Sequence, residues 1–563
     1  MLILSSSSII RGLKSVSSFT PTTFLLPSTL RASLRAASTV LFSSSSSSSS
    51  HYVTTPIYYV NASPHIGHAY TSIACDVLSR YAKLEGFETW LGTGVDEHGE
   101  KVEMNAKKSK LKTKEFCDDV ANTFKDLTDK VGMDSTVFVR TTSPEHMKGA
   151  QTLWRKMGEN GDIYKGVYEG WYSVRDESFY PESELTKGKD GDWIAPSGSE
   201  VEWREKEESY FFKLSEYQEP LLAHIENNPD FILPPERRNE VVSFLKSGLR
   251  DLSISRTSFS WGVPVPDDPD HVMYVWVDAL ANYLTQLGYG ENDEWKQYWP
   301  PNVQVVGKDI LRFHAVYWPA MLMSAGIELP ERVFAHGWWT REGEKISKSL
   351  GNVIDPFELI DEYGRDQTRF FLMAEARFGN DADFQDSRMV EKCNAALANS
   401  YGNLVQRTLS LVFKNCEGKL PARGELTDED VEMLRKCSRS YTDTTEMVSR
   451  QEIHNYVGHL LSLIRDLNAY IDMQEPWKLK KTDDQRMRTV LNVLVDAIRM
   501  VTIAFQPVIP TAAGNILDQM GVEEGDRKFV DIKDEGKALG EGTVINKPQA
   551  VFPRIEPKEE VTA

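Results

Sequence analysis

The sequence predicts an α/β fold in which a Rossmann-type parallel sheet carries an inserted module and is followed by an all-α helix bundle. Three observations support this prediction. A strand-helix-strand pattern occupies residues 52–93, which is the βαβ unit of a parallel sheet. Residues 169–207, rich in Gly, Glu, Lys and Trp, break this alternation and predict an inserted β-hairpin module. From about residue 387 the chain changes to long amphipathic helical segments, which predict a separate bundle.

The first βαβ unit is the clearest part of the pattern. Residues 52–60 are aromatic and β-branched, which predicts one buried strand before a short loop. The spacing of Ile73, Val77 and Tyr81 predicts a helix over residues 67–86, which Gly86 ends. Residues 87–93 form the second strand. We expect the α/β alternation to resume after the module, at residues 251–255, 272–276 and 303–306.

The later segments complete the expected domain organisation. Helical spacing predicts bundle helices at residues 389–414, 427–448, 451–473 and 485–506, and a charged tail that packs back on the bundle or the core. We therefore expect the following parts: a leader (1–50), the α/β domain in two halves (51–168 and 208–340), the module (169–207), a connecting region with a Lys-bearing loop (341–386), the bundle (387–520) and a C-terminal tail (521–563).

The first fifty residues differ in composition from the rest. They hold eighteen Ser and four cations but neither Asp nor Glu, and they end in an unbroken Ser run. Arg- and Ser-rich, acid-free N-termini are typical of organellar transit peptides, so we expect import into the mitochondrion and/or the chloroplast. A disordered low-complexity tail without an address is the alternative. The five cysteines include no CxxC pair, which indicates a reducing compartment and no cysteine-based metal site.

Charge and hydropathy limit the classes of partner. The 563 residues carry a net charge of −19, which argues against general electrostatic capture of nucleic acid. An RNA partner would have to be bound by local patches and specific contacts. No apolar run reaches the roughly 18–20 residues that a membrane-spanning helix requires, so we expect no membrane partner.

Two short motifs suit phosphate chemistry. His65 and His68 flank Gly67 at the first strand-to-helix junction, where a helix N-terminus favours anions. Far downstream, Lys345 and Lys348 lie on a Gly-flanked loop that suits a mobile polyphosphate clamp. Taken alone, a histidine pair of this spacing is more often part of a metal site or has no function. The lysine pair alone is as often a solvent-exposed charged segment as a phosphate-binding one.

Together, in this order, the two motifs resemble the HIGH and KMSKS motifs of class I aminoacyl-tRNA synthetases, with Ile346 in place of Met. Segments 54–61, 94–99, 274–279 and 307–314 further resemble the bacterial and organellar methionyl-tRNA synthetase family, and the similarity covers about residues 52–510. The resemblance implies a ligase that converts methionine and ATP into methionyl-adenylate and pyrophosphate. It then transfers methionine to the 3′-terminal adenosine of tRNA(Met), here for organellar translation.

The resemblance also implies roles for individual residues. Asp96 matches the carboxylate that holds the methionine ammonium, and Arg256 matches the arginine that orients it. The residues matching the methionine side-chain pocket are Ile57, Tyr59, Trp276, Ala279, Tyr283 and His314. Those matching the ATP site, with Mg²⁺ arriving on ATP, are Gly67, Asp309, His336, Gly337, Trp339, Ser347 and Ser349. The catalytic set is His65, His68, Lys345 and Lys348, and the anticodon set is Asn403, Arg407 and Trp477.

The chain departs from the family in the inserted module. Ser173, Asp176 and Ala195 stand where many relatives have zinc ligands, and residues 169–207 contain neither Cys nor His. Because tetrahedral zinc prefers thiolates and imidazoles, we expect no zinc. The module must then be held by packing, with a small core of Trp171, Tyr172, Phe179, Trp193 and Trp203. The C-terminal dimerisation appendix of many bacterial members is also missing, so we expect a monomer.

Two alternatives stay open from the sequence. A class I synthetase for leucine, valine, isoleucine or cysteine is disfavoured by the missing editing insertion and by Trp276, Tyr283 and His314. A non-catalytic, synthetase-like RNA-binding protein is disfavoured by the intact histidine and lysine motifs. Without the resemblance, ordinary core packing would be the better interpretation of Trp276 and Tyr283.

Overall fold

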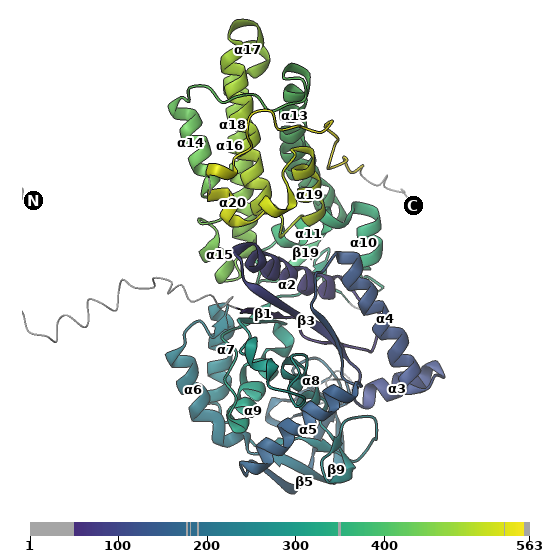
Figure 1. Cartoon of the computed structure of the whole chain (residues 1–563). Coiled ribbons are helices and arrows are strands. Elements are labelled where there is room, and N and C mark those ends of the chain that lie inside the picture. Colours follow the sequence, from purple (N-terminus) through teal and green to yellow (C-terminus); the bar gives the residue numbers. More distant parts are fainter. Residues whose placement is uncertain are drawn as a thin grey trace, which may run out of the picture. The chain divides into compact units, whose positions relative to one another are not determined.

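The computed structural model describes residues 50–175, 178–180, 182–188, 191–346, 351–533 and 535–556 (Figure 1). All of them belong to one compact unit, Ser48–Ala563. The predicted leader lies outside the described residues except for Ser50, which begins the first strand. No helix among the described residues is long and apolar enough to cross a membrane.

A parallel sheet forms the centre of the α/β part, as predicted. Its strand order is β10-β16-β15-β1-β3-β2, with β4 pairing β3, and every one of these pairs is parallel. The strands are β1 (Ser50–Thr54), β2 (Tyr58–Tyr59), β3 (Glu88–Asp96), β4 (Val137–Arg140), β10 (Ile232–Leu233), β15 (Val303–Gly307) and β16 (Val333–His336). Helix α2 (Ile66–Glu85) lies on one side of the sheet, and α8 (Val275–Thr285) and α9 (Trp318–Ala325) lie on the other (Figure 1).

Two strand predictions were wrong in detail. The single strand expected at residues 52–60 is two strands, because Pro56 has no N–H to donate to a ladder and separates β1 from β2. Residues 251–255 and 272–276 do not continue the parallel sheet. They form the short antiparallel strands β11 (Leu252–Ser253), β12 (Ser255–Arg256) and β14 (Asp268–Met273), after which α8 begins. Short apolar runs carry no information about strand direction, so the sequence could not distinguish the two arrangements.

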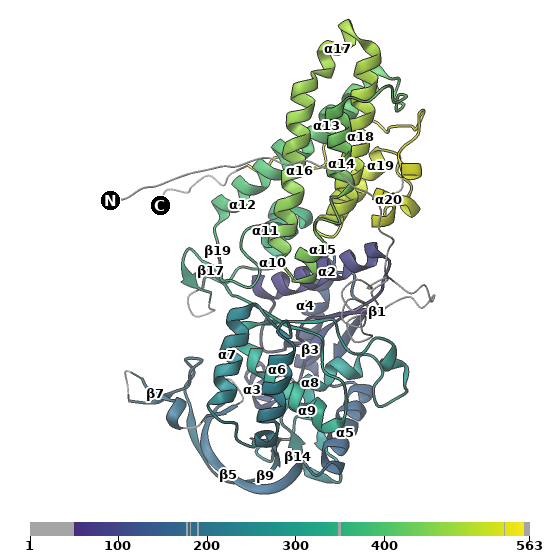
Figure 2. The same cartoon turned by 90° about the vertical axis from the view of Figure 1, so that its left-hand side faces the viewer.

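The inserted module is a long antiparallel hairpin of β5 (Ile163–Ser173) and β9 (Glu202–Phe212), which Figure 2 shows as a curved ribbon. Its ladder begins at the pair Ile163 and Phe212, outside the predicted limits of 169 and 207. Trp171 contacts both Trp193 and Trp203, at ring-centroid distances of 5.8 Å and 5.3 Å. Tyr172 is buried as expected, whereas Trp203 is 51% exposed.

The smaller elements of the module are β6 (Ser178–Tyr180), β7 (Thr186–Lys187) and β8 (Trp193–Ile194). The Ser173 hydroxyl lies 2.9 Å from that of Ser199, and both residues are buried. Asp176 and the Phe179 side chain lie outside the described part of the chain. Within that part, no group of three or more His, Cys, Asp or Glu side chains could hold a metal ion.

The helical part matches the predicted bundle closely. The expected helix at 389–414 is continuous from α12 (Asp386–Cys393) through a π-helical segment, Asn394–Gly402, into α13 (Asn403–Asn415). The segment expected at 427–448 is split into α14 (Asp428–Ser438) and α15 (Thr445–Ser449). The remaining helices are α16 (Ile453–Gln474), α17 (Pro476–Thr482), α18 (Asp484–Phe505), α19 (Pro510–Gln519) and α20 (Phe529–Lys533).

The C-terminal tail packs back as predicted. Phe529, Ile532, Ile545 and Phe552 are buried in the hydrophobic core that α2 shares with the bundle. Between sheet and bundle lie β17 (Trp339–Arg341), β18 (Glu344–Lys345), α10 (Pro356–Tyr363), α11 (Arg365–Ala374) and β19 (Ala382–Phe384).

A fully buried arginine joins the two parts. Arg369 on α11 makes an ion pair of 2.6 Å with Asp76 on α2. It also donates hydrogen bonds to the carbonyl oxygens of Val131, Pro507 and Val508, the last two directly after α18. The helix that begins at His65 and His68 is thereby bonded to the bundle through one side chain.

Candidate active site

The histidine motif forms the N-terminal cap of α2. His65 has an extended backbone, and its Nδ1 accepts the Gly67 N–H at 3.1 Å. In return, His68 Nδ1 accepts the His65 N–H at 3.0 Å, which completes a capping box. Because both Nδ1 atoms accept, each neutral ring carries its hydrogen on Nε2. A Cβ on residue 67 would lie 2.9 Å from the His65 ring, so glycine allows the ring to pack this closely against the first turn of α2.

The chain segment after β16 lies against α2. His336 Nε2 forms a 2.8 Å hydrogen bond with the Thr71 hydroxyl, and burial lowers the pKa of His336. A side chain at Gly337 would overlap the backbone of Asn380, so glycine permits this close approach. Trp339, predicted at the ATP site, has its indole buried in the core, 5.5 Å from the Tyr70 ring. Only its backbone could therefore face a nucleotide.

The neighbouring indole, Trp338, was missed by the sequence analysis. It is 41% exposed, and its Nε1 donates a 3.0 Å hydrogen bond to Asp309. The ammonium groups of Lys308 and Lys345 lie 4.3 Å and 4.9 Å from its ring centroid, which are cation–π distances. The signal that could have found it is its place directly after His336 and Gly337.

Described residues on either side of the lysine motif make backbone contacts near the start of α2. Lys345 ends β18, and the chain returns along residues 351–354, where the Ile354 carbonyl accepts the Ile66 N–H at 3.0 Å. Asn352 donates to the Lys345 carbonyl at 3.1 Å. The chain that follows the lysine motif therefore bonds to the first residue of α2, within the histidine motif. Ser347, Lys348 and Ser349 lie outside the described residues.

Three residues of the predicted methionine side-chain pocket lie on α8. Trp276, Ala279 and Tyr283 are spaced to share one face of this helix. The Tyr283 hydroxyl lies 2.7 Å from His314 Nε2, and His314 Nδ1 lies 3.0 Å from the Ile310 carbonyl. The ring must donate from Nδ1, so Nε2 accepts the tyrosine hydrogen. Burial lowers the pKa of His314 to about 4, which keeps the ring neutral. The Trp276 ring stacks on the Phe313 ring, with 3.8 Å between the ring centroids.

The predicted ammonium site lies at the carboxyl edge of the sheet. Buried Asp96 ends β3 and pairs in register with half-buried Tyr59 on β2. Half-buried Ile57 lies between β1 and β2. Arg256 is buried, donates to the Ser255 carbonyl at 2.7 Å, and lies 4.7 Å from the Tyr274 ring just before α8. Carboxyl ends of parallel strands are where α/β sheets bind ligands.

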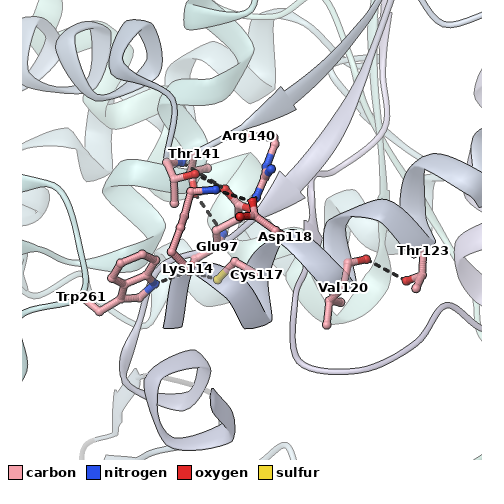
Figure 3. Close-up of polar contacts among 10 residues, drawn as sticks. Glu97, Lys114, Cys117, Asp118, Val120, Thr123, Arg140, Thr141 and Trp261 are labelled. Atoms are coloured by element: carbon pink, nitrogen blue, oxygen red, sulfur yellow. Dashed lines mark hydrogen bonds and ion pairs between the residues drawn. The ribbon is translucent and has the colours of Figure 1, made fainter. Parts of the chain in front are cut away.

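Glu97, the residue after Asp96, is the centre of a hydrogen-bond network that the sequence analysis also missed (Figure 3). The buried Glu97 carboxylate accepts Arg140 Nε at 2.9 Å and the Thr142 N–H at 3.3 Å. Its carbonyl accepts Trp261 Nε1 at 2.6 Å, and its N–H is accepted by the Thr141 hydroxyl at 3.0 Å. Acidic and imidazole side chains directly after an apolar strand were the available signal.

The predicted anticodon residues meet at one end of the bundle. Asn403 and Arg407 lie one turn apart on α13, and Asn403 is exposed. Arg407 forms an ion pair of 2.8 Å with Asp472, and its guanidinium lies 5.4 Å from the Trp477 ring on α17. Trp477 is 39% exposed, which leaves part of the indole open to a base.

Comparison with known proteins decides the family. Residues 51–409 match the family of tRNA synthetases class I (M), and residues 420–562 match the anticodon binding domain of methionyl tRNA ligase. The chain belongs to the methionyl-tRNA synthetase family. The methionine–tRNA ligase of Rickettsia bellii is 49% identical to this synthetase over 511 residues, covering 90% of this chain and 99% of the relative. The methionine–tRNA ligase of Mesorhizobium japonicum is 50% identical over 504 residues, covering 89% of this chain and 97% of the relative.

Solved structures lead to the same family. Mycobacterium tuberculosis methionyl-tRNA synthetase in complex with methionyl-adenylate has a TM-score of 0.87 and 45% identity, covering 90% of this chain and 100% of that one. The apo form of the same enzyme has a TM-score of 0.82 and 42% identity, and the match covers 91% of this chain and 99% of that one. These matches confirm the predicted fold class and the class I methionine–tRNA ligase activity that the resemblance implied for this synthetase.

Proposed function

We propose that this synthetase activates methionine with ATP and charges tRNA(Met) inside an organelle, with the residues predicted above in the predicted roles. The observations that carry the proposal are the neutral Tyr283–His314 pair and the buried carboxylate of Asp96 at the carboxyl end of β3. An apolar slot with one polar pair suits a thioether arm, and a buried carboxylate suits an ammonium group.

The chemistry of activation needs no protein nucleophile. The methionine carboxylate attacks the α-phosphorus of ATP, the bond to the bridging oxygen breaks, and pyrophosphate leaves with the electron pair. The protein contributes positioning and positive charge. In this proposal the Nε2–H groups of His65 and His68 and the ammonium groups of Lys345 and Lys348 stabilise the phosphate charge. Asp309, Gly337 and the Trp339 backbone line the adenosine.

Magnesium would arrive as the complex with ATP and neutralise phosphate charge, because Mg²⁺ is held chiefly by phosphates and water in such sites. The described residues fit this arrangement, since they form no group of three or more acidic, His or Cys side chains that would hold the ion alone. Zinc is not required in the proposal, because packed tryptophans and the Ser173–Ser199 hydrogen bond hold the described part of the module.

The second step places methionine on the tRNA. A ribose hydroxyl of the terminal adenosine attacks the methionyl carbonyl, and AMP leaves. In this proposal Trp477 stacks on an anticodon base while Asn403 and Arg407 bond base edges. Recognition by stacking and base edges is compatible with a net charge of −19.

The proposed targeting signal is the acid-free leader, residues 1–50. The family match begins at residue 51, directly after the Ser-rich segment, which supports a separate role for residues 1–50. Residues 1–50 fused to a fluorescent protein should enter mitochondria, chloroplasts or both. A diffuse cytosolic signal would contradict the organellar part alone. We also propose a monomer, which light scattering on the purified protein would test.

Pyrophosphate exchange with a panel of amino acids tests the activity. The full chain should exchange pyrophosphate into ATP with methionine and with no other amino acid at a comparable rate. Exchange with leucine, valine, isoleucine or cysteine would favour a synthetase of another specificity. No exchange with any amino acid, from protein that is folded by circular dichroism, would favour a non-catalytic RNA-binding role.

A further inference from the structure

A buried carboxylate between two histidines lies behind the proposed methionine pocket. Asp278 on α8 is 1% exposed. Its Oδ2 lies 2.6 Å from His98 Nδ1, and its Oδ1 lies 2.7 Å from His146 Nε2. Both histidines are buried as well. The three side chains come from the end of β3, from α8 and from α5 (Pro144–Glu159).

The hydrogen-bond roles in this cluster follow from the carboxylate. Burial alone would raise the pKa of Asp278, yet His98 and His146 lower it to about 2, so the group is ionised. A carboxylate only accepts, so both facing ring nitrogens donate. A buried charge is tolerated when it receives such charge-assisted bonds. His146 Nδ1 also lies 2.8 Å from the Thr285 hydroxyl on α8, which ties α5 to α8 a second time.

The position of the cluster relates it to the two halves of the methionine site. Asp278 lies between Trp276 and Ala279, which match the side-chain pocket. His98 lies two residues after Asp96, which matches the ammonium site. The Asp278–His98 bond therefore joins the helix that carries the pocket to the strand end that carries the carboxylate.

The segment between these bonds is fixed from its other side. Glu97 is bonded through its carboxylate to Arg140 and through its carbonyl to Trp261 (Figure 3). The Gly99 N–H donates to the Trp261 carbonyl at 3.2 Å. With Glu97 bonded to Arg140 of β4, the bond from His98 to Asp278 links α8 directly to the segment that follows Asp96.

We propose that Asp278 is a positioning residue that fixes the distance between the ammonium site and the thioether pocket. The proposal rests on the methionine-binding function proposed above. A ligand that carries both an ammonium group and a thioether must satisfy both sites at once. A change in their separation should therefore weaken such a ligand more than one that engages a single site.

The test compares two ligands on matched variants of the full chain. The ligands are methionine and 4-(methylthio)butanoate, which keeps the thioether and carboxylate but lacks the ammonium group. For Asp278→Asn we expect the KM for methionine to rise on the order of 10- to 100-fold, while the KM for ATP changes less than about twofold. The inhibition constant of 4-(methylthio)butanoate should change less than about threefold.

Two further variants separate positioning from general stability. His98→Phe keeps a ring that has no N–H, so it removes the bond from its other end and should reproduce the effect, and the double variant should be no worse than either single one. His146→Asn removes the outer histidine, so it should lower the melting temperature without changing the ratio of the two ligand constants. His98→Phe also keeps the proposal testable if Asp278→Asn does not fold.

The outcomes are distinguishable. Equal weakening of both ligands, or no change in the methionine KM for either Asp278→Asn or His98→Phe, would overturn the positioning role. Absence of methionine-dependent exchange in the unaltered protein would instead overturn the proposed function on which the inference rests.

Discussion

The protonation state of His314 decides what the pocket offers to a ligand. Its Nδ1–H is committed to the Ile310 carbonyl, and its Nε2 accepts from Tyr283. With its pKa lowered to about 4 by burial, the ring is neutral throughout the physiological range. A neutral imidazole costs less to bury beside an apolar arm than a charged one would.

This protonation state makes the stability depend on pH. The pKa of His314 is lower in the folded protein than the ordinary 6.5, so the unfolded chain binds the proton more readily. The free energy of unfolding should therefore fall as the pH drops from 6.5 to about 4, by about 3 kcal/mol from this group alone. His314→Gln should flatten the curve in that window, measured by urea unfolding at several pH values. Parallel curves for the two proteins would show that His314 does not titrate there.

Asp96 should be the residue whose charge methionine needs. Asp96→Asn keeps the size of the side chain but removes the charge that pairs with an ammonium group in a buried site. We expect methionine-dependent exchange to fall by about 100-fold or more, because a lost buried ion pair costs about 2–5 kcal/mol. The melting temperature should stay within a few degrees. Full activity in the variant would refute the ammonium role.

At this scale the sequence could identify residues through resemblance but not their partners. Tyr283 and His314 were proposed as pocket residues from the resemblance, yet their hydrogen bond and the neutrality of the ring depend on burial that only the fold creates. Asp278 was overlooked because its partner His98 is 180 residues away in sequence. Trp338 was overlooked because its contacts with Asp309 and Lys345 also join separate segments of the chain.

Among the elements, α2 combines a structural cap with proposed chemistry. His65→Ala should lose the Gly67 N–H bond and destabilise the protein by about 1 kcal/mol as well as impair exchange. Asparagine is a good N-cap but has no imidazole, so His65→Asn should recover the stability and not the exchange rate. Thermal unfolding and exchange assays on both variants would separate the two roles. Recovery of both in His65→Asn would make the residue only a cap.

Helix α17 should act on tRNA and not on the adenylate. Trp477→Ala should lower kcat/KM for tRNA(Met) by about 10- to 100-fold, since stacking contributes about 1–3 kcal/mol per base. Methionine-dependent exchange should be nearly unchanged. Val431→Ala, an exposed apolar residue on α14, serves as the control and should change neither assay. Equal loss of charging and exchange in Trp477→Ala would indicate a structural role.

The long periodic elements were predictable and the short ones were not. Helices α2, α16 and α18 were placed nearly to the residue, because their apolar spacing is sustained over several turns. The division of residues 52–60 at Pro56 has a local cause that the strand prediction did not weigh, whereas the antiparallel pairing of β12 with β14 depends on neighbours remote in sequence. Local composition cannot contain that information.

For the whole molecule, the central contact is the buried Arg369. It pairs with Asp76 and donates to three carbonyls, so Arg369→Met would leave several buried polar groups without a donor. We expect a loss of about 3–5 kcal/mol in the free energy of unfolding. Arg80→Met removes the other arginine on the same carboxylate, which is partly exposed, and should cost only about 1 kcal/mol. Urea unfolding of both variants measures the difference, and equal losses would contradict a special role for Arg369.

The order of the domains was readable from composition and periodicity, but their attachment was not. A parallel sheet, an inserted hairpin and a bundle each have a local pattern. The link through Arg369 and the shared core of α2 and the bundle join residues hundreds of positions apart. The family could be recognised from the two motifs because their residues are local in sequence, whereas the contact between Ile66 and Ile354 joins distant parts of the chain.

A structure with ATP and methioninol bound tests the central claim most directly, because methioninol keeps the amine and thioether but has no carboxylate to react. The amine should lie at Asp96, the thioether against Tyr283 and His314, and the phosphates between the His65–His68 turn and Lys345. Phosphates that contact neither the histidine turn nor Lys345, or a thioether seated away from α8, would contradict the account.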